Sequence, residues 1–352
     1  MKILLSSYNH KPFIGGIETY SNELKKYLEN TNYKCIFVTQ SFSKYKLLRI
    51  IKIISISTFK LIFNKIDVVH ITNINLWPIV LTNYFKKNKT VFFINLHGLE
   101  LIYGNRKKIV SKIYNIYVPY KFINKLTNLY FFSNSKETLK LAEKKLDKTK
   151  IKYIPMGVSN CMKLKTDESV NFNQFFYLGR ITKRKGINWF VEEVLPSFPN
   201  KKLLIGGPIA DTKEFEAISK SKQVDYLGVL NQKEIIELHR SSFLTIFPNF
   251  RNNNELDFEG FGISFLEAIS NGGLPITTVF QGLRSATLDG KIGICMKDNS
   301  ASTWLSAIED ITSKGLLYRK NIIENGQQLI NENFLWEDIF ERTINEYKKL
   351  FQ

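Results

Sequence analysis

The stretch Phe247–Thr278, FPNFRNNNELDFEGFGISFLEAISNGGLPITT, is the segment around which the rest of the chain is organised. An apolar strand ends at Phe247, and a polar loop, a glycine turn, a helix predicted over 263–270 and a second apolar strand follow. A strand that leads through a glycine turn into a helix forms an anion site, because the first helical N–H groups lack partners inside the helix and its dipole favours negative charge. This order of elements predicts a phosphate-binding turn within an α/β fold.

Two carboxylates frame this turn, Glu259 in the loop and Glu267 in the helix, with seven residues between them. Carboxylates repel phosphate, but they accept hydrogen bonds from hydroxyl groups such as those of a sugar or a ribose. Two glutamates at this spacing are also common as an exposed loop acid and a helix-surface acid. With the glycine turn beside them, we interpret the pair as part of a site for a sugar joined to a phosphate.

The segment EGFGISFLEA resembles the E-x7-E motif of the retaining GT-B glycosyltransferases, glycosyltransferase family 4 in particular. The resemblance implies that Glu259 binds hydroxyl groups of the donor sugar and that Glu267 binds the ribose of a nucleotide sugar. The turn residues that it places against the same donor are Gly260, Phe261, Gly262 and Ile263. It also implies two Rossmann-like, doubly wound parallel-sheet domains that face each other across a cleft.

Short apolar segments alternate with longer amphipathic ones along the chain, which is typical of doubly wound parallel sheets. The predicted strands are Lys2–Ser6, Cys35–Thr39, Val68–Ile71, Val91–Leu96, Leu129–Phe132, Ile151–Ile154, Phe175–Leu178, Lys202–Ile205, Val224–Tyr226, Phe243–Phe247, Pro275–Thr278 and Gly293–Cys295. We expect an acceptor-binding domain over residues 1–160 and a nucleotide-sugar-binding domain over residues 161–334, joined by a polar linker within 156–173. Residues 335–352 have helical spacing and resemble the terminal helix that crosses back onto the first domain.

The loop after the first predicted strand contains Gly15 and Gly16 and leads into a helix that begins near Ile17. Adjacent glycines let the backbone approach a ligand, and doubly wound sheets bind ligands at such strand ends. A lone Gly-Gly pair is also found in ordinary loops, and the pattern differs from the dinucleotide fingerprint GxGxxG, which argues against a dehydrogenase. The loop resembles the family's glycine loop, which lies against the donor diphosphate.

The sequence YLGRITKRKG places Arg180 and Lys185 beside a glycine turn at the end of a strand. Two cations suit a diphosphate, Arg as a bidentate fork and Lys as a point charge. The alternative is a solvated basic loop. The family's diphosphate-binding pair matches Arg180 and Lys185.

His97 closes the fourth predicted strand. A lone histidine is more often structural than catalytic, and His70 and His239 are predicted to be structural. The family carries a histidine near the donor sugar at the strand end where His97 stands, so the resemblance implies a site role for it.

The net charge of +18 is concentrated in the first part of the chain. Residues 1–136 hold 21 Lys and Arg against 5 Asp and Glu, whereas the remaining residues hold 29 against 27. The segments 41–65 and 106–125 combine basic, aliphatic and aromatic residues with no acid, which suits the surface of an anionic membrane. The alternative is a pair of sheet-covering helices whose lysines extend into water.

At 352 residues, with 44% hydrophobic residues, the chain suits two globular domains. Its three cysteines, Cys35, Cys161 and Cys295, make neither a disulfide framework nor a metal cluster, so we expect a reducing, cytoplasmic compartment. The N-terminus is predicted to be a strand rather than a signal peptide. The longest uncharged run, Val68–Phe85, is interrupted by His70 and Pro78 and is predicted to be a strand and the start of a helix, not a membrane span.

The resemblance to family 4, taken with these observations, implies a retaining, metal-independent glycosyltransferase that acts at the cytoplasmic face of the membrane. The expected donor is a nucleotide-diphosphate sugar, UDP favoured over GDP, and the expected acceptor is a lipid-linked glycan. No cofactor or metal is expected, since the chain lacks a DxD pair. The alternatives are a GT-B relative that is not a transferase, such as a sugar-nucleotide epimerase or a phosphorylase, and a basic nucleic-acid-binding protein, although no recognition motif for nucleic acid is visible. The oligomeric state is left open.

Overall fold

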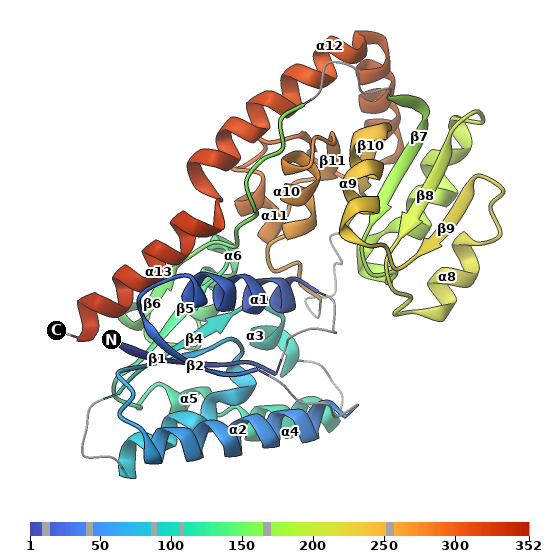
Figure 1. Cartoon of the computed structure of the whole chain (residues 1–352). Helices are drawn as coiled ribbons and strands as arrows, with labels where there is room; N and C mark the ends of the chain where they lie inside the picture. Colours follow the sequence, from blue (N-terminus) through green and yellow to red (C-terminus); the bar gives the residue numbers. More distant parts are fainter. Residues whose placement is uncertain are drawn as a thin grey trace. The chain divides into compact units, whose positions relative to one another are not determined.

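The computed structural model describes residues 1–8, 15–39, 45–85, 90–105, 109–164, 170–250 and 257–351. The chain divides into two compact units (Figure 1). Unit 1 comprises Met1–Gly157, Glu255–Phe261 and Trp336–Gln352, and unit 2 comprises Val158–Asn254 and Gly262–Leu335. Among the described helices, none combines the length and the apolar character needed to cross a membrane.

Unit 1 contains a six-stranded sheet in the order β2-β1-β3-β4-β5-β6, and every strand pair is parallel. The strands are β1 (Lys2–Ser6), β2 (Lys34–Val38), β3 (Val68–Ile71), β4 (Val91–Leu96), β5 (Leu129–Ser133) and β6 (Ile151–Tyr153). The strand order reverses between β1 and β3. Their mainly apolar sequences suit a parallel sheet that is covered on both faces.

Unit 2 contains a second parallel six-stranded sheet, in the order β12-β11-β10-β7-β8-β9. The strands are β7 (Asn171–Leu178), β8 (Lys202–Gly206), β9 (Val224–Gly228), β10 (Ser242–Phe247), β11 (Pro275–Thr278) and β12 (Ile294–Met296). The strand order reverses between β7 and β10. The two sheets confirm the predicted α/β fold with two doubly wound parallel sheets.

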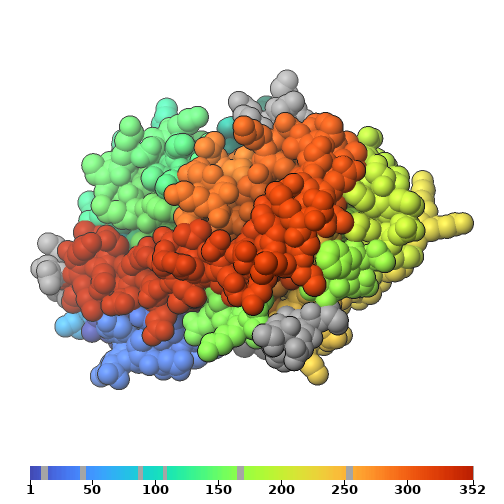
Figure 2. All heavy atoms as spheres, turned by 90° about the horizontal axis from the view of Figure 1, so that it is seen from above, coloured from blue at the N-terminus to red at the C-terminus, as the bar shows by residue number. Residues whose placement is uncertain are grey.

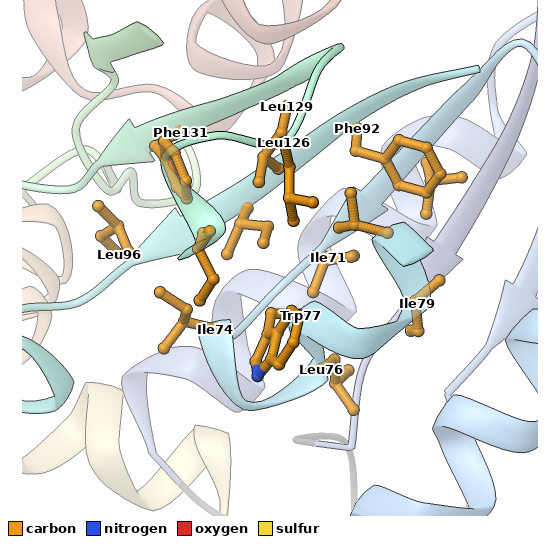
Figure 3. Close-up of a cluster of buried hydrophobic side chains, with 14 of the residues drawn as sticks. Ile71, Ile74, Leu76, Trp77, Ile79, Phe92, Leu96, Leu126, Leu129 and Phe131 are labelled. Carbon is orange, nitrogen blue, oxygen red and sulfur yellow. The ribbon is translucent and has the colours of Figure 1, made fainter. Parts of the chain in front are cut away.

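The helices of unit 1 cover both faces of its sheet. They are α1 (Gly16–Glu29), α2 (Lys46–Phe63), the 3₁₀ helix η1 (Ile74–Phe85), α3 (Leu99–Tyr103), α4 (Ile109–Tyr117), α5 (Tyr120–Ile123), α6 (Lys136–Ala142), η2 (Lys148–Lys150) and α13 (Trp336–Phe351). One buried cluster joins strand residues such as Ile71 and Phe92 to Trp77 of η1 (Figure 3). The same cluster includes Ile53 of α2 and Ile123 of α5, so α2, η1 and α5 share one face of the sheet.

On the other face of this sheet, α1 and α13 pack around a buried histidine. The ring of His70 in β3 bonds to the hydroxyl groups of Tyr20 in α1 and Tyr347 in α13. Burial lowers the pKa of His70 to about 3, so the imidazole is neutral. His70 therefore has a structural role, because its bond to Tyr347 joins α13 to the sheet. In Figure 2, the outer side of α13 lies at the red end of the colour scale.

The helices of unit 2 enclose a separate core around Trp304, which is fully buried. They are η3 (Lys183–Lys185), α7 (Ile187–Trp189), the π-helical turn η4 (Phe190–Val194), η5 (Leu195–Ser197), α8 (Thr212–Ile218), α9 (Gln232–Ser241), α10 (Ile263–Ser270), α11 (Gly282–Ala286) and α12 (Ala301–Asn333). The long α12 is two helices joined at a kink at Gly315, where φ is 71°. His239 is buried and bonds through Nδ1 to the Thr245 hydroxyl at 3.0 Å.

The predicted strands all occur, most of them with bounds within one or two residues of the prediction, but the predicted start of β7 was wrong. β7 begins at Asn171, four residues before the predicted start at Phe175, because Asn171 pairs with Ser242 of β10 although it is polar and exposed. The polar linker predicted to extend to Asn173 therefore ends before this strand. The segment predicted as the start of a helix after β3 is the 3₁₀ helix η1, which has Pro78 inside it.

Candidate functional site

The strand order identifies where each sheet is suited to bind a ligand. In open α/β sheets, ligands bind beyond the carboxyl ends of the strands, at the point where the strand order reverses. In unit 1 this point lies beyond β1 and β3, and Gly15 and Gly16 follow β1 in the chain. In unit 2 it lies beyond β7 and β10, and Arg180 follows β7 after one residue, Gly179.

The Gly15–Gly16 pair starts α1, as predicted for a loop that leads into a helix N-terminus. Gly15 is the N-cap of α1, and its carbonyl accepts the N–H of Thr19 at 2.9 Å. The Glu18 carboxylate bends back towards Gly15, where an added Cβ would lie 2.6 Å from it. A carboxylate of the protein itself thus stands at this N-terminus, and the predicted diphosphate contact of Gly15 and Gly16 stays a prediction.

His97 lies at the carboxyl end of β4 and is almost completely buried. Its Nε2 donates a hydrogen bond to the carbonyl oxygen of Thr72 at 2.8 Å. Its backbone N–H donates to the buried carboxylate of Glu100. Because a carbonyl only accepts, Nε2 carries a proton, and Nδ1 is the ring nitrogen left to contact a ligand.

Within unit 1, the segment that carries Glu259 packs against the turn that follows β4. A Cβ on Gly260 would collide with the carbonyl oxygen of His97, and one on Gly98 would collide with the ring of Phe258. Both positions require glycine, and Gly98 also has a φ of 100°. The structure therefore brings the Glu259–Gly260 segment against the backbone of His97.

Glu259 itself is only 8% exposed. The hypothetical Cβ of Gly260 lies 3.3 Å from Nδ2 of Asn134, the residue that follows β5. Oδ1 of Asn134 is buried and has no hydrogen-bond partner among the described residues. In this corner of unit 1, the Glu259–Gly260 segment meets the strand-end residues His97 and Asn134, whose side-chain types can accept and donate hydrogen bonds with hydroxyl groups.

In unit 2, Arg180 and Lys185 flank one tight turn between β7 and α7. Arg180 is exposed, and its carbonyl accepts the hydroxyl of Tyr177 at 2.9 Å. Gly186 ends the turn in the left-handed region with φ 70°, where a Cβ would collide with the carbonyl oxygen of Pro248. The turn is therefore packed against the residues that follow β10, at the point where the strand order reverses.

The predicted helix of the central motif is found as α10 with the predicted bounds. Its N-cap is Gly262, in the left-handed region with φ 93°, and a Cβ there would lie 2.5 Å from the side chain of Leu283. Ile263 begins the helix, and Glu267 lies one turn further on and is partly exposed. The first turn holds no acid, as an anion site at this helix end requires.

The predicted residues thus fall into two groups. Unit 1 holds Gly15, Gly16, His97, Glu259, Gly260 and Phe261, and unit 2 holds Arg180, Lys185, Gly262, Ile263 and Glu267. Residues 251–256, in the polar loop that precedes Glu259, lie outside the described residues. Among the residues that the structure describes, no group of three or more His, Cys, Asp or Glu side chains is placed to hold a metal ion.

Sequence reasoning missed three residues of the unit 1 corner: Glu100, Asn134 and Phe258. Asn134 follows a predicted strand, as His97 does, and that position is a signal that the sequence contains. Glu100 is an acid in an otherwise basic region. Phe258 has no such signal, because its contact with Gly98 joins segments that are far apart in the chain.

Comparisons with solved structures define the class of the fold. The sucrose-phosphate synthase of Thermosynechococcus elongatus matches with a TM-score of 0.76 and 15% identity, over 99% of this chain and 98% of that one. Anabaena HepE, solved in complex with UDP and glucose, matches with a TM-score of 0.71 and 14% identity, over 99% of each chain. With its two parallel six-stranded sheets, the chain has the GT-B fold.

Comparisons of sequence point to a type of enzyme within that fold. Residues 162–329, a little under half of the chain, match the family model described as Glycosyl transferases group 1. An uncharacterised glycosyltransferase of Methanocaldococcus jannaschii is 24% identical in an alignment that covers 100% of this chain and 98% of the relative. These matches support a glycosyltransferase.

Proposed function

We propose that this protein is a retaining glycosyltransferase of family 4 that transfers a hexosyl group from a nucleotide-diphosphate sugar to a hydroxyl of a lipid-linked glycan. The observation that carries the proposal is the group 1 match over residues 162–329, which spans the Arg180–Lys185 turn and the segment from Glu259 to Glu267. UDP is favoured over GDP, in line with the complexes of HepE with UDP and with UDP-glucose. The product would belong to a cell-surface polysaccharide, a lipopolysaccharide or a glycolipid.

The difficult step of this reaction is the departure of the diphosphate, on which negative charge develops. Arg180 would stabilise this charge as a bidentate fork and Lys185 as a point charge. Preorganised cations and N–H groups act most strongly on charge that appears in the transition state. On this proposal, the cations and the N-terminus of α10 supply the stabilisation without a metal ion.

The carboxylates would hold the donor through its hydroxyl groups. Glu259, buried in unit 1, is proposed to accept hydrogen bonds from the sugar, and Glu267 from the ribose. His97 would contact the same sugar through Nδ1. The bond from the anomeric carbon to the diphosphate oxygen breaks, a bond to the acceptor oxygen forms on the same face, and the acceptor proton passes to the leaving phosphate.

The test is transfer of radiolabelled sugar from UDP- and GDP-sugars to a lipid extract. We expect transfer by the wild type, and a loss of about a hundredfold to a thousandfold in Glu259→Ala, because a preorganised group that positions the donor is removed. Glu143→Ala, which changes a partly exposed acid of unit 1 at the end of α6, is the matched control and should leave transfer unchanged.

Transfer by Glu259→Ala at the wild-type rate would contradict this placement of the site. If the donor is instead converted into its epimer without an acceptor, or is cleaved only with inorganic phosphate, the protein is a GT-B relative that does not transfer sugar. Salt-dependent binding to DNA or RNA without nucleotide-sugar turnover would identify a nucleic-acid-binding protein.

A further inference from the structure

The outer layer of unit 1 exposes apolar side chains where a water-facing helix normally has polar ones. Most of the large hydrophobic side chains that are exposed in the described part of the chain lie between residues 45 and 122. Two helices, α2 and α4, carry most of them. Single exposed hydrophobic residues need no explanation, but a contiguous group marks an interaction surface.

Helix α2 is apolar on two opposite sides. Its inner side buries Ile50, Ile53, Ser57 and Leu61 against the sheet. Its outer side exposes Leu47, Leu48, Ile51, Phe59, Ile62 and Phe63. Of these, Leu48, Ile51, Phe59 and Ile62 lie on one helix face with Ser55, at steps of three and four residues. A helix that is hydrophobic all round is expected to be covered on all sides.

Helix α4 repeats this arrangement over a shorter length. Its outer side exposes Ile109, Val110, Ile113 and Ile116, the last of which is 79% exposed. Its inner side buries Ser111, and Tyr114 packs against the same buried cluster as α2.

The two helices lie in one layer on the same face of the sheet. α2 packs against η1, and η1 is joined to α4 by the hydrogen bond from Trp77 Nε1 to the carbonyl oxygen of Tyr117, 2.7 Å long. Figure 1 shows α2 and α4 together in the layer below the sheet of unit 1. Their outer sides therefore belong to one surface, which we call the α2–α4 face: Leu47, Leu48, Ile51, Phe59, Ile62, Phe63, Ile109, Val110, Ile113 and Ile116.

The charged residues of α2, α4 and the chain segments beside them have a single sign. Exposed lysines accompany the apolar residues on and beside both helices: Lys52, Lys60, Lys65, Lys112, Lys121 and Lys125. Neither residues 30–66 nor residues 101–136 contain an Asp or Glu. An apolar surface set among cations is complementary to an anionic bilayer, which offers a hydrocarbon interior below negatively charged headgroups.

We propose that the α2–α4 face docks the protein on an anionic membrane, with Phe59, Phe63 and Ile116 entering the interface and the lysines contacting lipid headgroups. This inference deepens the proposed function, on which it rests for the lipid-linked nature of the acceptor. Docking by this face holds unit 1, where the acceptor is expected to bind, at the surface where such an acceptor is found.

Two other occupants fit the charges less well. A second copy of this chain, paired through the same face, would bring lysines against lysines around the contact, because a two-fold interface uses the same patch on both partners. A nucleic acid would be attracted by the lysines but would leave the exposed aliphatic side chains without an apolar partner.

The test is flotation of the full-length protein with vesicles of phosphatidylcholine alone and of phosphatidylcholine with about 30% phosphatidylglycerol, without any nucleotide sugar. We expect binding to the anionic vesicles to be at least about tenfold tighter than to neutral ones and to weaken with salt. The double variant F59S/F63S should lower binding to anionic vesicles about tenfold or more, since two exposed aromatic side chains no longer enter the interface. I113S/I116S should act in the same direction.

The matched control is L316S/L317S in α12 of unit 2, where Leu317 is 72% exposed and thus comparable with Phe63 at 69%. This control should bind vesicles like the wild type. The inference is overturned if neutral and anionic vesicles bind equally, if neither binds, or if F59S/F63S matches the control. It is also overturned if these variants instead abolish a dimer seen by sedimentation velocity. Since flotation needs no nucleotide sugar, and nucleotide binding needs no vesicle, failure of one proposal is distinguishable from failure of the other.

Discussion

The two units share an architecture and differ in how their candidate residues are assembled. Both have a parallel six-stranded sheet whose strand order reverses once. In unit 2, Arg180, Lys185 and Gly186 lie within one turn of consecutive residues. In unit 1, His97 meets Gly260, and the two are far apart in the chain. A site built from one turn can be found as a motif, whereas a site built from distant segments appears only when the chain is folded.

The units also differ at their surfaces. The first 136 residues carry most of the net charge, and α2 and α4 turn apolar residues outwards. In unit 2, helix α9 begins with a capping box formed by Asn231 and Glu234, and its exposed surface is polar. This contrast is the basis of the proposals that unit 1 docks on an anionic membrane and that unit 2 binds a nucleotide at its strand ends.

The largest loss of stability is expected from Gly186→Ala in unit 2. The change forces a side chain into the left-handed region and against the carbonyl oxygen of Pro248, so it should cost about 3 kcal/mol in free energy of unfolding and weaken nucleotide binding. Gly228→Ala is the matched control: its φ is 76°, but nothing lies within 4 Å of the added Cβ. It should cost only about 1–2 kcal/mol. Urea unfolding of both variants measures the difference, and equal losses would show that the contact with Pro248 does not constrain the turn.

A second prediction separates the two units by function. Gly260→Ala should push Glu259 away from His97, because the new Cβ collides with a backbone carbonyl that cannot move freely. We expect transfer to fall about tenfold to a hundredfold, as misplaced catalytic groups do, and UDP affinity to stay as in the wild type. Transfer rates and calorimetric UDP titration check both parts. A parallel loss of UDP affinity would mean that the unit 1 corner binds the nucleotide as well.

A smaller loss of stability, present in both units, is expected when the pH falls. Burial lowers the pKa of His70 in unit 1 and of His239 in unit 2 from 6.5 to about 3. Below pH 6.5 the unfolded chain takes up protons that the folded protein does not, so each histidine lowers the stability by about 1.4 kcal/mol per pH unit until about pH 3. By about pH 5 each should have removed roughly 2 kcal/mol.

The variants His70→Gln and His239→Gln isolate these contributions. Each should show a weaker pH dependence of unfolding than the wild type, measured by urea titration at about pH 7.5 and about pH 5. A pH dependence that neither variant reduces would mean that the carboxylates, not these histidines, govern stability in acid.

Most of the fold could be predicted from the sequence, because buried parallel strands are apolar runs bounded by polar residues. The run Val91–Leu96 is found with its predicted bounds. The polar start of β7 could not be predicted, since Asn171 joins the sheet only through its pairing with β10.

The candidate site was predictable to the extent that it is local. The α10 turn and the Arg180–Lys185 turn follow from glycines, cations and strand ends. The packing of Phe258 on Gly98 could not be predicted from the sequence, because it depends on a contact between distant segments. The position of Glu18 at Gly15 was also missed, since the rotamer of a first-turn acid is not encoded in a spacing.

On the proposed function, the strand ends of unit 2 hold a nucleoside diphosphate through Arg180. Calorimetric titration with UDP, GDP, ADP and CDP, with and without EDTA, tests it most directly, using Lys183→Ala in the same turn as the control for Arg180→Ala. We expect one diphosphate, UDP first, to bind whether or not EDTA is present. We also expect binding to fall about tenfold to a hundredfold in Arg180→Ala, because a charge-assisted hydrogen-bonded pair is lost, but not in Lys183→Ala. No binding of any diphosphate, or equal binding by both variants and the wild type, would contradict it.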